Sequence, residues 1–381
     1  MGEASMMLPL LRDRLAPSGE LTELRGRLPV ASIAVPDEIG ARGWLVTGYA
    51  QVREVLGDTV RFSNELSHLA GTGIEQLAEQ DPGGLGFRDP PEHTRLRRLL
   101  TREFTVRRLA RLGPRIDALT TELLDGMEAD GPGVDLVERF AVPLPSQVIC
   151  ELLGVPDADR TEFERRSTAR FDMIAQFGNS LDVVNESLDY LRGLAARERA
   201  HPGDGLLGAL VREHGDAVSD EDLAQLADGV LTGGHETTAS MIALSACELM
   251  SDDALRARLF DDTHGVVEDL LRRMSVVQVA FPRFARDDTV VGGREIAKGD
   301  AMICSLSAAN TDPAAHGAGH LAFGYGIHRC VGAELGRMEL RAALPALFAR
   351  LPGLTPAVDE DDLELRPFSI VFGMDSLPVR W

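Results

Sequence analysis

The sequence predicts a mainly α-helical protein with a smaller β region. Apolar residues recur at helical spacing over much of the first half, for example between Phe104 and Met127. Only a few short stretches have the composition of strands. Because 44% of the 381 residues are apolar, the chain can bury a sizeable core, and a disordered chain is excluded.

Charge and cysteine content limit the partners and the compartment. The chain has 60 acidic and 39 basic residues, a net charge of −21, which argues against binding of nucleic acid or an anionic membrane. Four cysteines without a Cys-x-x-Cys pair indicate neither a zinc site nor a disulfide framework. The apolar stretch at residues 6–11 is too short for a signal peptide or a membrane span. We therefore expect a cytoplasmic protein.

The expected elements of the first half begin with a short strand at residues 43–48 and a helix at 50–56. Residues 63–88 predict a long loop with one helical turn at 74–77. Such loops are often functional, although a plain surface excursion is the alternative. Further helices are expected at residues 89–98, 104–127, 144–155, 160–174 and 181–200.

In the second half, Ser219-Asp220-Glu221-Asp222 resembles a capping box and begins a helix that continues to about Met250. Cys304 is expected in a strand core, and Cys150 and Cys247 in helix cores. The remaining expected elements are a short helix at 266–273, a strand at 276–281, a hairpin of 289–293 with 296–304, a helix from 333 to about 344 and a terminal hairpin at 368–381.

Residues 323–332, Phe-Gly-Tyr-Gly-Ile-His-Arg-Cys-Val-Gly, carry the most informative motif. Cys330 ends a glycine-rich turn and precedes an expected helix, whose N-terminal N–H groups favour a thiolate. A thiolate with amide donors is a strong axial ligand for haem iron. Gly324 and Gly326 would let the backbone lie flat against a large planar ligand. The alternative is that Cys330 is a small buried hydrophobic residue in an ordinary turn.

The complete spacing Phe-x-x-Gly-x-His-x-Cys-x-Gly resembles the haem-ligand loop of the cytochrome P450 family. The resemblance implies that Cys330 ligates the iron of haem b, and that Phe323, Gly324, His328 and Gly332 bind the cofactor. Its motifs occur in family order over nearly the whole chain. The implied fold is a single P450 domain, residues 1–381, with the haem between the long central helix and the cysteine loop.

Three basic residues are expected to contact the haem propionates. His93 and Arg97 share one face of a helix and can reach one anionic group. The alternative is a solvated basic face, which we accept for Arg95 and Arg98. The resemblance implies that His93 and Arg97 bind the propionates and that Arg283 is a third contact, although Arg283 could also form a surface ion pair.

Residues 232–238, Thr-Gly-Gly-His-Glu-Thr-Thr, lie in the middle of the long helix. Each of the two glycines costs about 1 kcal/mol relative to alanine, so a compensating gain is expected. A local widening of the helix is one such gain, and close packing of another helix is the alternative. A zinc-protease motif is excluded, because Ala239 stands where a second histidine is required.

The same segment resembles the oxygen-activation motif of the family, Gly-Gly-x-acid-Thr. The resemblance implies that Gly234 contacts the cofactor, that the Thr237 hydroxyl lies beside bound O2, and that Glu236 is the adjacent acid. Both catalytic residues would deliver protons for cleavage of the O–O bond. The residues expected on the substrate side are Phe87, Gly233, Val279, Ala280 and Phe372.

Two departures from the family pattern concern how the cysteine loop is held. Asp269-x-x-Arg272 stands where the family carries Glu-x-x-Arg, and the two residues can still pair on a helix. In the family, an arginine from the loop before the cysteine segment usually joins this Glu/Arg pair and completes a stabilising triad. Here the loop at residues 314–322 is shorter than usual, and no arginine occurs from Glu295 to His328, so the third member of the triad is missing. These departures bear on haem retention and stability rather than on the fold.

The implied activity is insertion of one oxygen atom from O2 into a hydrophobic small molecule, a secondary metabolite such as a polyketide or terpenoid. The chain has no G-x-G-x-x-G nucleotide motif, so electrons are expected from a ferredoxin and its reductase. Docking candidates are Arg95, Arg98, Arg329 and Arg337, and a monomer is expected. The alternatives are a peroxygenase that uses hydrogen peroxide, and a catalytically impaired haem-binding or partner-activating homologue.

Overall fold

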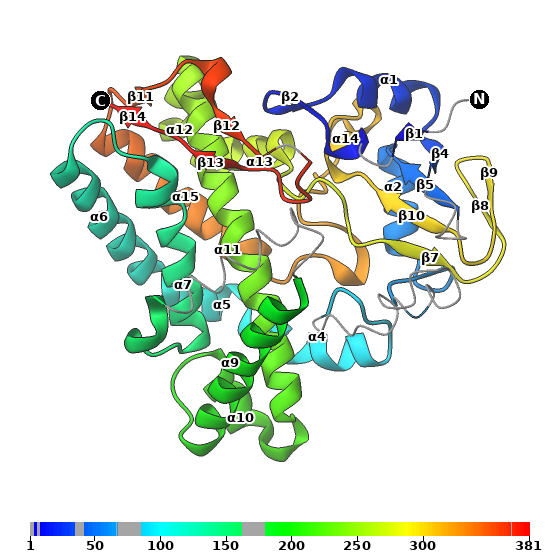
Figure 1. The fold of residues 1–381 in the computed structure, drawn as a ribbon, viewed down its shortest axis with the longest axis horizontal. Helices are drawn as coiled ribbons and strands as arrows, with labels where there is room; N and C mark the ends of the chain where they lie inside the picture. Colours follow the sequence, from blue (N-terminus) through cyan, green and yellow to red (C-terminus); the bar gives the residue numbers. More distant parts are fainter. Residues whose placement is uncertain are drawn as a thin grey trace. The chain divides into compact units, whose positions relative to one another are not determined.

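A computed structural model describes residues 4–5, 8–34, 42–65, 67, 85–161, 180–366 and 368–381. The chain divides into two compact units (Figure 1). The first unit comprises Met1–Arg95 and Glu268–Cys330, and the second comprises Leu96–Val267 and Val331–Trp381. The helical turn expected at 74–77 and most of the helix expected at 160–174 lie outside the described residues.

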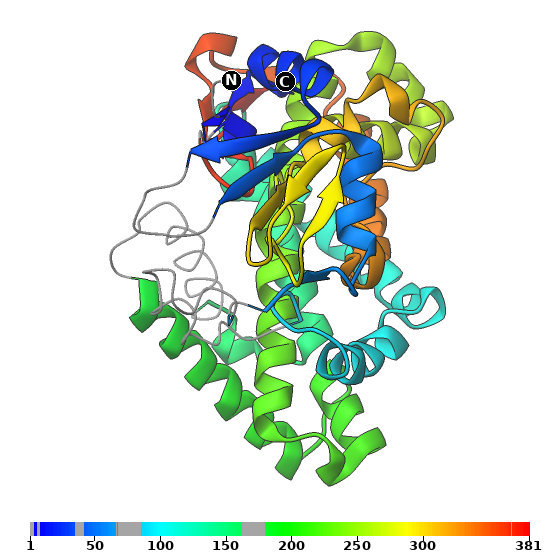
Figure 2. The same ribbon diagram turned by 90° about the vertical axis from the view of Figure 1, so that its right-hand side faces the viewer.

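A six-stranded mixed sheet organises the first unit, in the order β1-β4-β5-β10-β7-β6. Strand β10 pairs with β5 in parallel and with β7 antiparallel, and Figure 2 shows the yellow strands beside the blue ones. The strands are β1 (Ala4–Ser5), β4 (Val30–Ala34), β5 (Gly43–Val46), β6 (Phe62–Ser63), β7 (Arg283–Ala285) and β10 (Ala301–Cys304).

Strand β5 confirms the strand predicted at the start of the chain. Its four residues are all buried, because both faces of the sheet are covered. Trp44 and Val46 point into one apolar cluster, and Leu45 points into another on the opposite face. The alternation of side chains along a strand explains this division.

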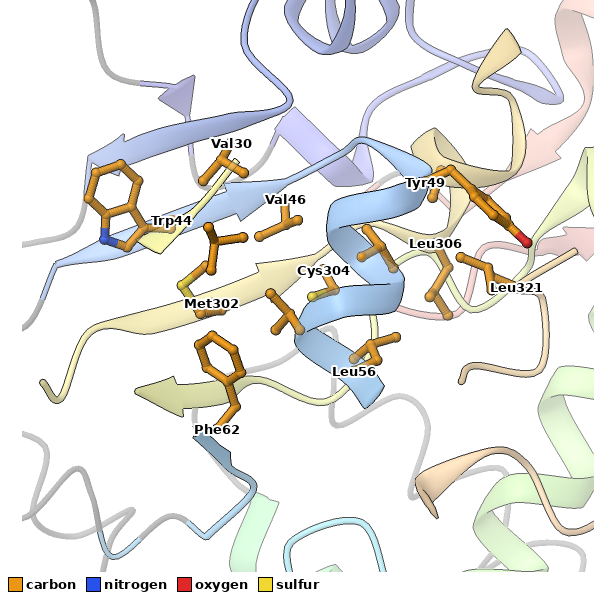
Figure 3. Close-up of a cluster of buried hydrophobic side chains, with 14 of the residues drawn as sticks. Val30, Trp44, Val46, Tyr49, Leu56, Phe62, Met302, Cys304, Leu306 and Leu321 are labelled. Atoms are coloured by element: carbon orange, nitrogen blue, oxygen red, sulfur yellow. The ribbon is translucent and has the colours of Figure 1, made fainter. Parts of the chain in front are cut away.

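Helix α2 (Tyr49–Gly57) packs on the face that carries Trp44 and Val46 (Figure 3). Its buried residues Val52, Val55 and Leu56 recur at helical spacing and meet Cys304 and Leu306. Cys304 is fully buried on β10, as predicted. This cluster lies directly beside the segment that leads to Cys330, because Leu321 belongs to it.

The other elements of the first unit are short. The two-residue turn Gly292-Gly293 has positive φ at both positions, which favours a tight hairpin. These elements are η1 (Leu8–Leu10), β2 (Arg12–Asp13), β3 (Ala16–Pro17), α1 (Gly19–Arg27), β8 (Thr289–Val291), β9 (Arg294–Ile296), α14 (Leu306–Asn310), η8 (Pro313–Ala315) and η9 (Gly326–His328). Helices α4 (Glu92–Glu103) and α13 (Thr263–Met274) each run from one unit into the other.

Helix α11 (Asp220–Ser251) is the central element of the second unit and confirms the predicted long helix. Ser219 and Asp222 form the expected capping box at its start. The long green helix of Figure 1 packs against α7 (Pro143–Leu153), α9 (Ser180–Ala200) and α15 (Ala333–Arg350). Because these helices cover α11, most side chains of its second half are buried.

The second unit contains further helices and short strands besides α11 and its three neighbours. Cys150 on α7 and Cys247 on α11 lie in helix cores, as predicted. The elements are α5 (Val106–Leu109), η4 (Ala110–Leu112), α6 (Gly113–Asp130), the π-helix η5 (Val137–Ala141), η6 (Asp157–Asp159), α10 (Leu206–His214), η7 (Gly215–Ala217), α12 (Asp253–Asp261), β11 (Thr355–Pro356), η10 (Glu360–Asp362), β12 (Glu364–Leu365), β13 (Met374–Ser376) and β14 (Val379–Arg380). Within the described residues, no helix is long and apolar enough to cross a membrane.

Three predictions about strands need correction. Residues 276–281 do not form a regular strand: they contain isolated bridge positions, one of which pairs Val279 with Ser305. The hairpin predicted from 289–293 with 296–304 is wrong in its second strand: β8 pairs with β9, whereas β10 pairs with β5 and β7.

The terminal hairpin was predicted wrongly, since β13 pairs with β12 and β14 pairs with β11. The chain stays extended between β13 and β14. The N–H groups of Leu377 and Val379 donate to the Asp135 carboxylate at 3.0 Å and the Val134 carbonyl at 2.9 Å, so no turn forms there.

Candidate functional site

The cysteine loop of the first unit has the tight geometry that its glycines predict. The Cys330 N–H donates to the Phe323 carbonyl at 2.8 Å, which closes the loop. Gly324 and Gly326 both have positive φ, +69° and +74°. A Cβ on Gly324 would meet nothing within 4 Å, whereas one on Gly326 would clash with the Leu56 carbonyl of α2. Packing on α2 therefore explains Gly326, and Gly324 keeps an open surface.

Cys330 is the exposed member of the four cysteines, and the other three are buried. Burial raises the pKa of the Cys247 thiol to about 11 and that of Cys304 to about 12. Those two thiols are therefore held protonated in apolar surroundings. The alternative that Cys330 is a small buried hydrophobic residue is wrong, and its side chain can reach a ligand.

His93 and His328 are brought together in the first unit. The ring of His93, at the start of α4, lies 4.2 Å from the ring of His328 between centroids. His93 is almost fully buried. Arg97 follows one turn later on α4 and is half-buried. Two predicted cofactor-binding residues from distant parts of the sequence thus meet beside the cysteine loop.

Arg283 on β7 is a buried cation, and the charge of Asp89 acts on it without a direct ion pair among the described residues. Only 3% of the residue is exposed to solvent. Its Nη1 donates to the carbonyls of Phe281 at 2.8 Å and Pro282 at 3.4 Å. Within the part of the chain that the structure describes, no carboxylate forms an ion pair with it. Burial lowers the pKa of Arg283 to about 10. A surface ion pair is therefore excluded, and the site suits an anionic group such as a propionate.

The shortened loop at residues 314–322 is anchored to the rest of the first unit. Arg272 on α13 donates from Nη2 to the Ala318 carbonyl, and the Tyr49 hydroxyl donates to the Gly319 carbonyl at 2.7 Å. The Leu321 N–H donates to the Asn310 side chain at 2.6 Å. Arg272 thus holds the backbone of the loop directly. Its predicted pairing with Asp269 stays a prediction.

His320 links the same loop to α13. Its Nε2 lies 3.0 Å from a carboxylate oxygen of Glu268, and its Nδ1 lies 3.2 Å from the Ala322 N–H. A neutral ring with its proton on Nε2 satisfies both contacts. The ring also contacts Phe323, with centroids 5.8 Å apart. His320 therefore fixes the start of the cysteine loop, a role the sequence analysis did not assign to it.

In the second unit, the two glycines of α11 differ in their surroundings. A Cβ on Gly234 would lie 2.5 Å from Cδ1 of Ile149 on α7, whereas one on Gly233 would meet nothing within 4 Å. Close helix packing therefore accounts for Gly234. The predicted widening of the helix is wrong, because α11 is regular α-helix throughout. The Thr237 hydroxyl instead donates to the Gly233 carbonyl at 2.6 Å within the helix.

Glu236 is buried and pairs with an arginine from the end of the chain. Arg366 donates from Nη1 to the Glu236 carboxylate and from Nη2 to the Ser240 hydroxyl at 2.9 Å. No local pattern in the sequence indicates this partner, because the two residues are 130 positions apart. The neighbouring His235 is a core residue whose pKa is lowered to about 4 by burial.

The residues predicted on the substrate side occupy different surroundings. Phe87 packs edge-on against Phe281, with ring centroids 4.9 Å apart, and Val279 and Ala280 nearby in sequence are half-buried. Gly233 borders open space. Phe372 is only 1% exposed and belongs to the core of the second unit.

The predicted docking arginines are solvent-facing for the most part. Arg95, Arg98 and Arg329 are exposed, and Arg95 pairs with Glu92 at 2.7 Å on α4. Arg337 is half-buried and donates to the Ala333 carbonyl at 3.2 Å. All four arginines therefore stay predicted docking residues.

Comparison with known proteins identifies the family. The chain is 40% identical over 400 aligned positions to cytochrome P450 FAS1 of Rhodococcoides fascians, covering 100% of both chains. It is 38% identical over 382 positions to the mycinamicin IV hydroxylase/epoxidase of Micromonospora griseorubida, covering 96% and 95% of the two chains. Its fold matches the structure of OxyE, a cytochrome P450 involved in teicoplanin biosynthesis, with a TM-score of 0.87, 37% identity and coverage of 98% and 99%. No family model matches the sequence.

The chain therefore belongs to the cytochrome P450 family. The predicted fold class and family are confirmed, and with them the prediction of a monooxygenase that depends on haem iron.

Proposed function

We propose that the protein uses haem b and O2 to hydroxylate or epoxidise a hydrophobic small molecule in secondary metabolism. The observation that carries the proposal is the exposed Cys330 at the end of a closed glycine-rich loop, in a chain whose other cysteines are buried. Support also comes from relatives with related names, such as the mycinamicin IV hydroxylase/epoxidase. A polyketide or terpenoid substrate fits this class.

Cys330 would hold the cofactor, with Phe323, Gly324, His328 and Gly332 of its loop. When bound, haem supplies the activation of O2, and a thiolate ligand favours cleavage of the O–O bond. His93, Arg97 and Arg283 would bind the two propionates, and the burial of the Arg283 guanidinium favours an anionic partner. Gly234 is proposed as a further contact.

Glu236 and Thr237 would move the protons that reduction of O2 consumes. The buried carboxylate of Glu236 can take a proton from solvent and pass it on. The Thr237 hydroxyl donates to the Gly233 carbonyl, which fixes its orientation and leaves its oxygen able to accept. The proposed substrate contacts are Phe87, Gly233, Val279, Ala280 and Phe372.

Electrons would come from a ferredoxin and its reductase, with the protein acting as a cytoplasmic monomer. The net charge of −21 makes a local basic area necessary for attracting an acidic partner. Arg98→Glu combined with Arg329→Glu should slow reduction by ferredoxin and weaken its dependence on salt. Unchanged reduction rates would remove these arginines from the docking surface.

The function is tested by incubating the purified protein with isotopically labelled O2, a ferredoxin, its reductase and a panel of polyketides and terpenoids. Products that gain one labelled oxygen atom are expected, as is water formation from the second atom. Turnover with hydrogen peroxide alone, but none with ferredoxin, would identify a peroxygenase. No product under either condition, while a partner protein still depends on a Cys330→Ala variant, would identify a partner-activating homologue.

A further inference from the structure

Glu236 is held by a residue that lies outside every motif considered so far. Arg366 follows β12 directly, and its backbone N–H donates to the Gly373 carbonyl at 2.9 Å, next to β13. Its Nη1 donates to Glu236, and its Nη2 donates to Ser240 at 2.9 Å, one turn later on α11. The arginine is thus fixed by the β12–β13 hairpin at its backbone and by α11 at its guanidinium.

The pair with Glu236 is the important contact of Arg366. The side chain of Glu236 is 9% exposed, whereas that of Asp375, whose carboxylate lies 3.5 Å from Nε, is 64% exposed. An exposed ion pair contributes little, but a buried carboxylate depends strongly on its partner. Arg366 therefore contacts Glu236 where the carboxylate is buried, and Asp375 is a minor neighbour.

Gly373 provides independent support for this arrangement. A Cβ at Gly373 would overlap Nη2 of Arg366 and would lie 2.5 Å from the Ser240 hydroxyl. The backbone at Gly373 is not in the left-handed region, so other residues could adopt it. The glycine is therefore needed for the space that the guanidinium fills, and the hairpin is shaped around the contact with α11.

We propose that Arg366 is a positioning residue for proton delivery by Glu236, an inference that rests on the proposed function. The guanidinium keeps the carboxylate ionised and turned toward the hairpin. A proton from solvent that binds a carboxylate oxygen removes the charge that attracts Arg366. The resulting O–H group can turn and pass its proton on through Thr237, after which the ionised carboxylate returns to Arg366. Arg366 would thereby hold Glu236 at the position where it takes up a proton from solvent, away from the position where it releases the proton to Thr237.

The pairing itself is tested without turnover, by urea unfolding of the purified protein. Arg366→Met, Glu236→Gln and the double variant form a cycle. The unfolding equilibrium constant of the double variant should differ from the product of the single effects by about 5- to 30-fold, because the partners share one buried contact. Additive effects would overturn the pairing.

The functional role is tested by the ratio of hydrogen peroxide released to O2 consumed, with a ferredoxin and its reductase and no added substrate. Arg366→Met should release several-fold more peroxide per O2 and lower the rate of water formation by about tenfold, since a positioned acid contributes about 10²- to 10⁴-fold. Arg366→Lys should restore most of the wild-type ratio. Gly373→Ala should reproduce the defect, because it displaces the guanidinium while the charge remains.

Arg350→Met is the matched control. Arg350 on α15 also pairs with two carboxylates, Asp125 and Glu128, but it does so at the surface of the same unit. It should leave the peroxide ratio unchanged. If the wild type reduces O2 with ferredoxin and Arg366→Met behaves like Arg350→Met, the role of Arg366 is overturned while the proposed function stands. A wild type that does not use O2 would overturn both.

Discussion

Replacing either of the two adjacent glycines of α11, Gly233 and Gly234, by alanine should change the stability of the protein in opposite directions. Gly233→Ala adds a methyl group toward open space, so only helix propensity changes, and the variant should be about 1 kcal/mol more stable. Gly234→Ala gains the same propensity but places its Cβ 2.5 Å from Cδ1 of Ile149 and 3.1 Å from Cγ1.

The contact at Gly234 outweighs the gain in propensity. Carbon atoms prefer a separation of about 3.5–4.0 Å, so Ile149 would have to move by about 1 Å. Ile149 is only 1% exposed and has little room to change its rotamer. Overpacking of this kind costs about 1–3 kcal/mol. Net destabilisation of about 1 kcal/mol is therefore expected, and the two variants should differ by about 2 kcal/mol.

The measurement is urea unfolding of both variants, followed by circular dichroism. Ile149→Val removes Cδ1 and alone costs about 0.5–1.5 kcal/mol. Combined with Gly234→Ala it should cost less than the sum of the two single effects, because the overlap is relieved. The reasoning would be refuted if Gly234→Ala were as stable as Gly233→Ala, or if the combination with Ile149→Val were additive.

Three further predictions concern other parts of the molecule. In haem-free protein a thiol reagent should label Cys330 rapidly and the three buried cysteines slowly, and bound haem should protect Cys330 from the reagent. Rapid labelling of a second cysteine would contradict the structure. Burial raises the pKa of Glu339 well above 4.5, so the folded form stays protonated while the unfolded chain ionises. The wild type therefore loses stability as the pH rises from 4.5 toward the folded pKa, and the advantage of Glu339→Gln in urea unfolding should be larger at pH 8 than at pH 5. His320→Ala should lower the free energy of unfolding by about 1–3 kcal/mol, because the Ala322 N–H loses its acceptor. The same variant should lose haem faster. Equal rates of haem transfer to apomyoglobin from the variant and the wild type would argue against a role of His320 in haem retention.

The sequence was most informative where structure depends on local chemistry. The capping box at Ser219 and the apolar spacing of α11 and α2 depend on residues within a few positions, and the predicted helices are confirmed. The buried run of β5 was also recognisable as a strand. In the candidate site, the motif of Cys330 predicted a closed turn, which the bond from its N–H to Phe323 confirms.

Contacts between distant segments were beyond the sequence. Strand β13 pairs with β12 and β14 pairs with β11, and the backbone that links them donates from Leu377 to Asp135, 242 positions away. Arg366 and His320 carried no motif, because their partners are 130 and 52 positions away. The missing triad arginine suggested weak anchoring of the cysteine loop. Direct bonds from Arg272 and Tyr49 to the loop backbone provide an alternative anchor that no pattern in the sequence indicates.

The central claim is that Cys330 binds haem iron as a thiolate. The most direct test is the carbon monoxide difference spectrum of the purified, dithionite-reduced protein, with Cys330→Ser as the control. The account predicts a strong Soret band at the long-wavelength position that marks thiolate ligation, and its loss in the variant. A band at the shorter wavelength of histidine or thiol ligation, no bound haem, or a spectrum unaffected by Cys330→Ser would contradict it.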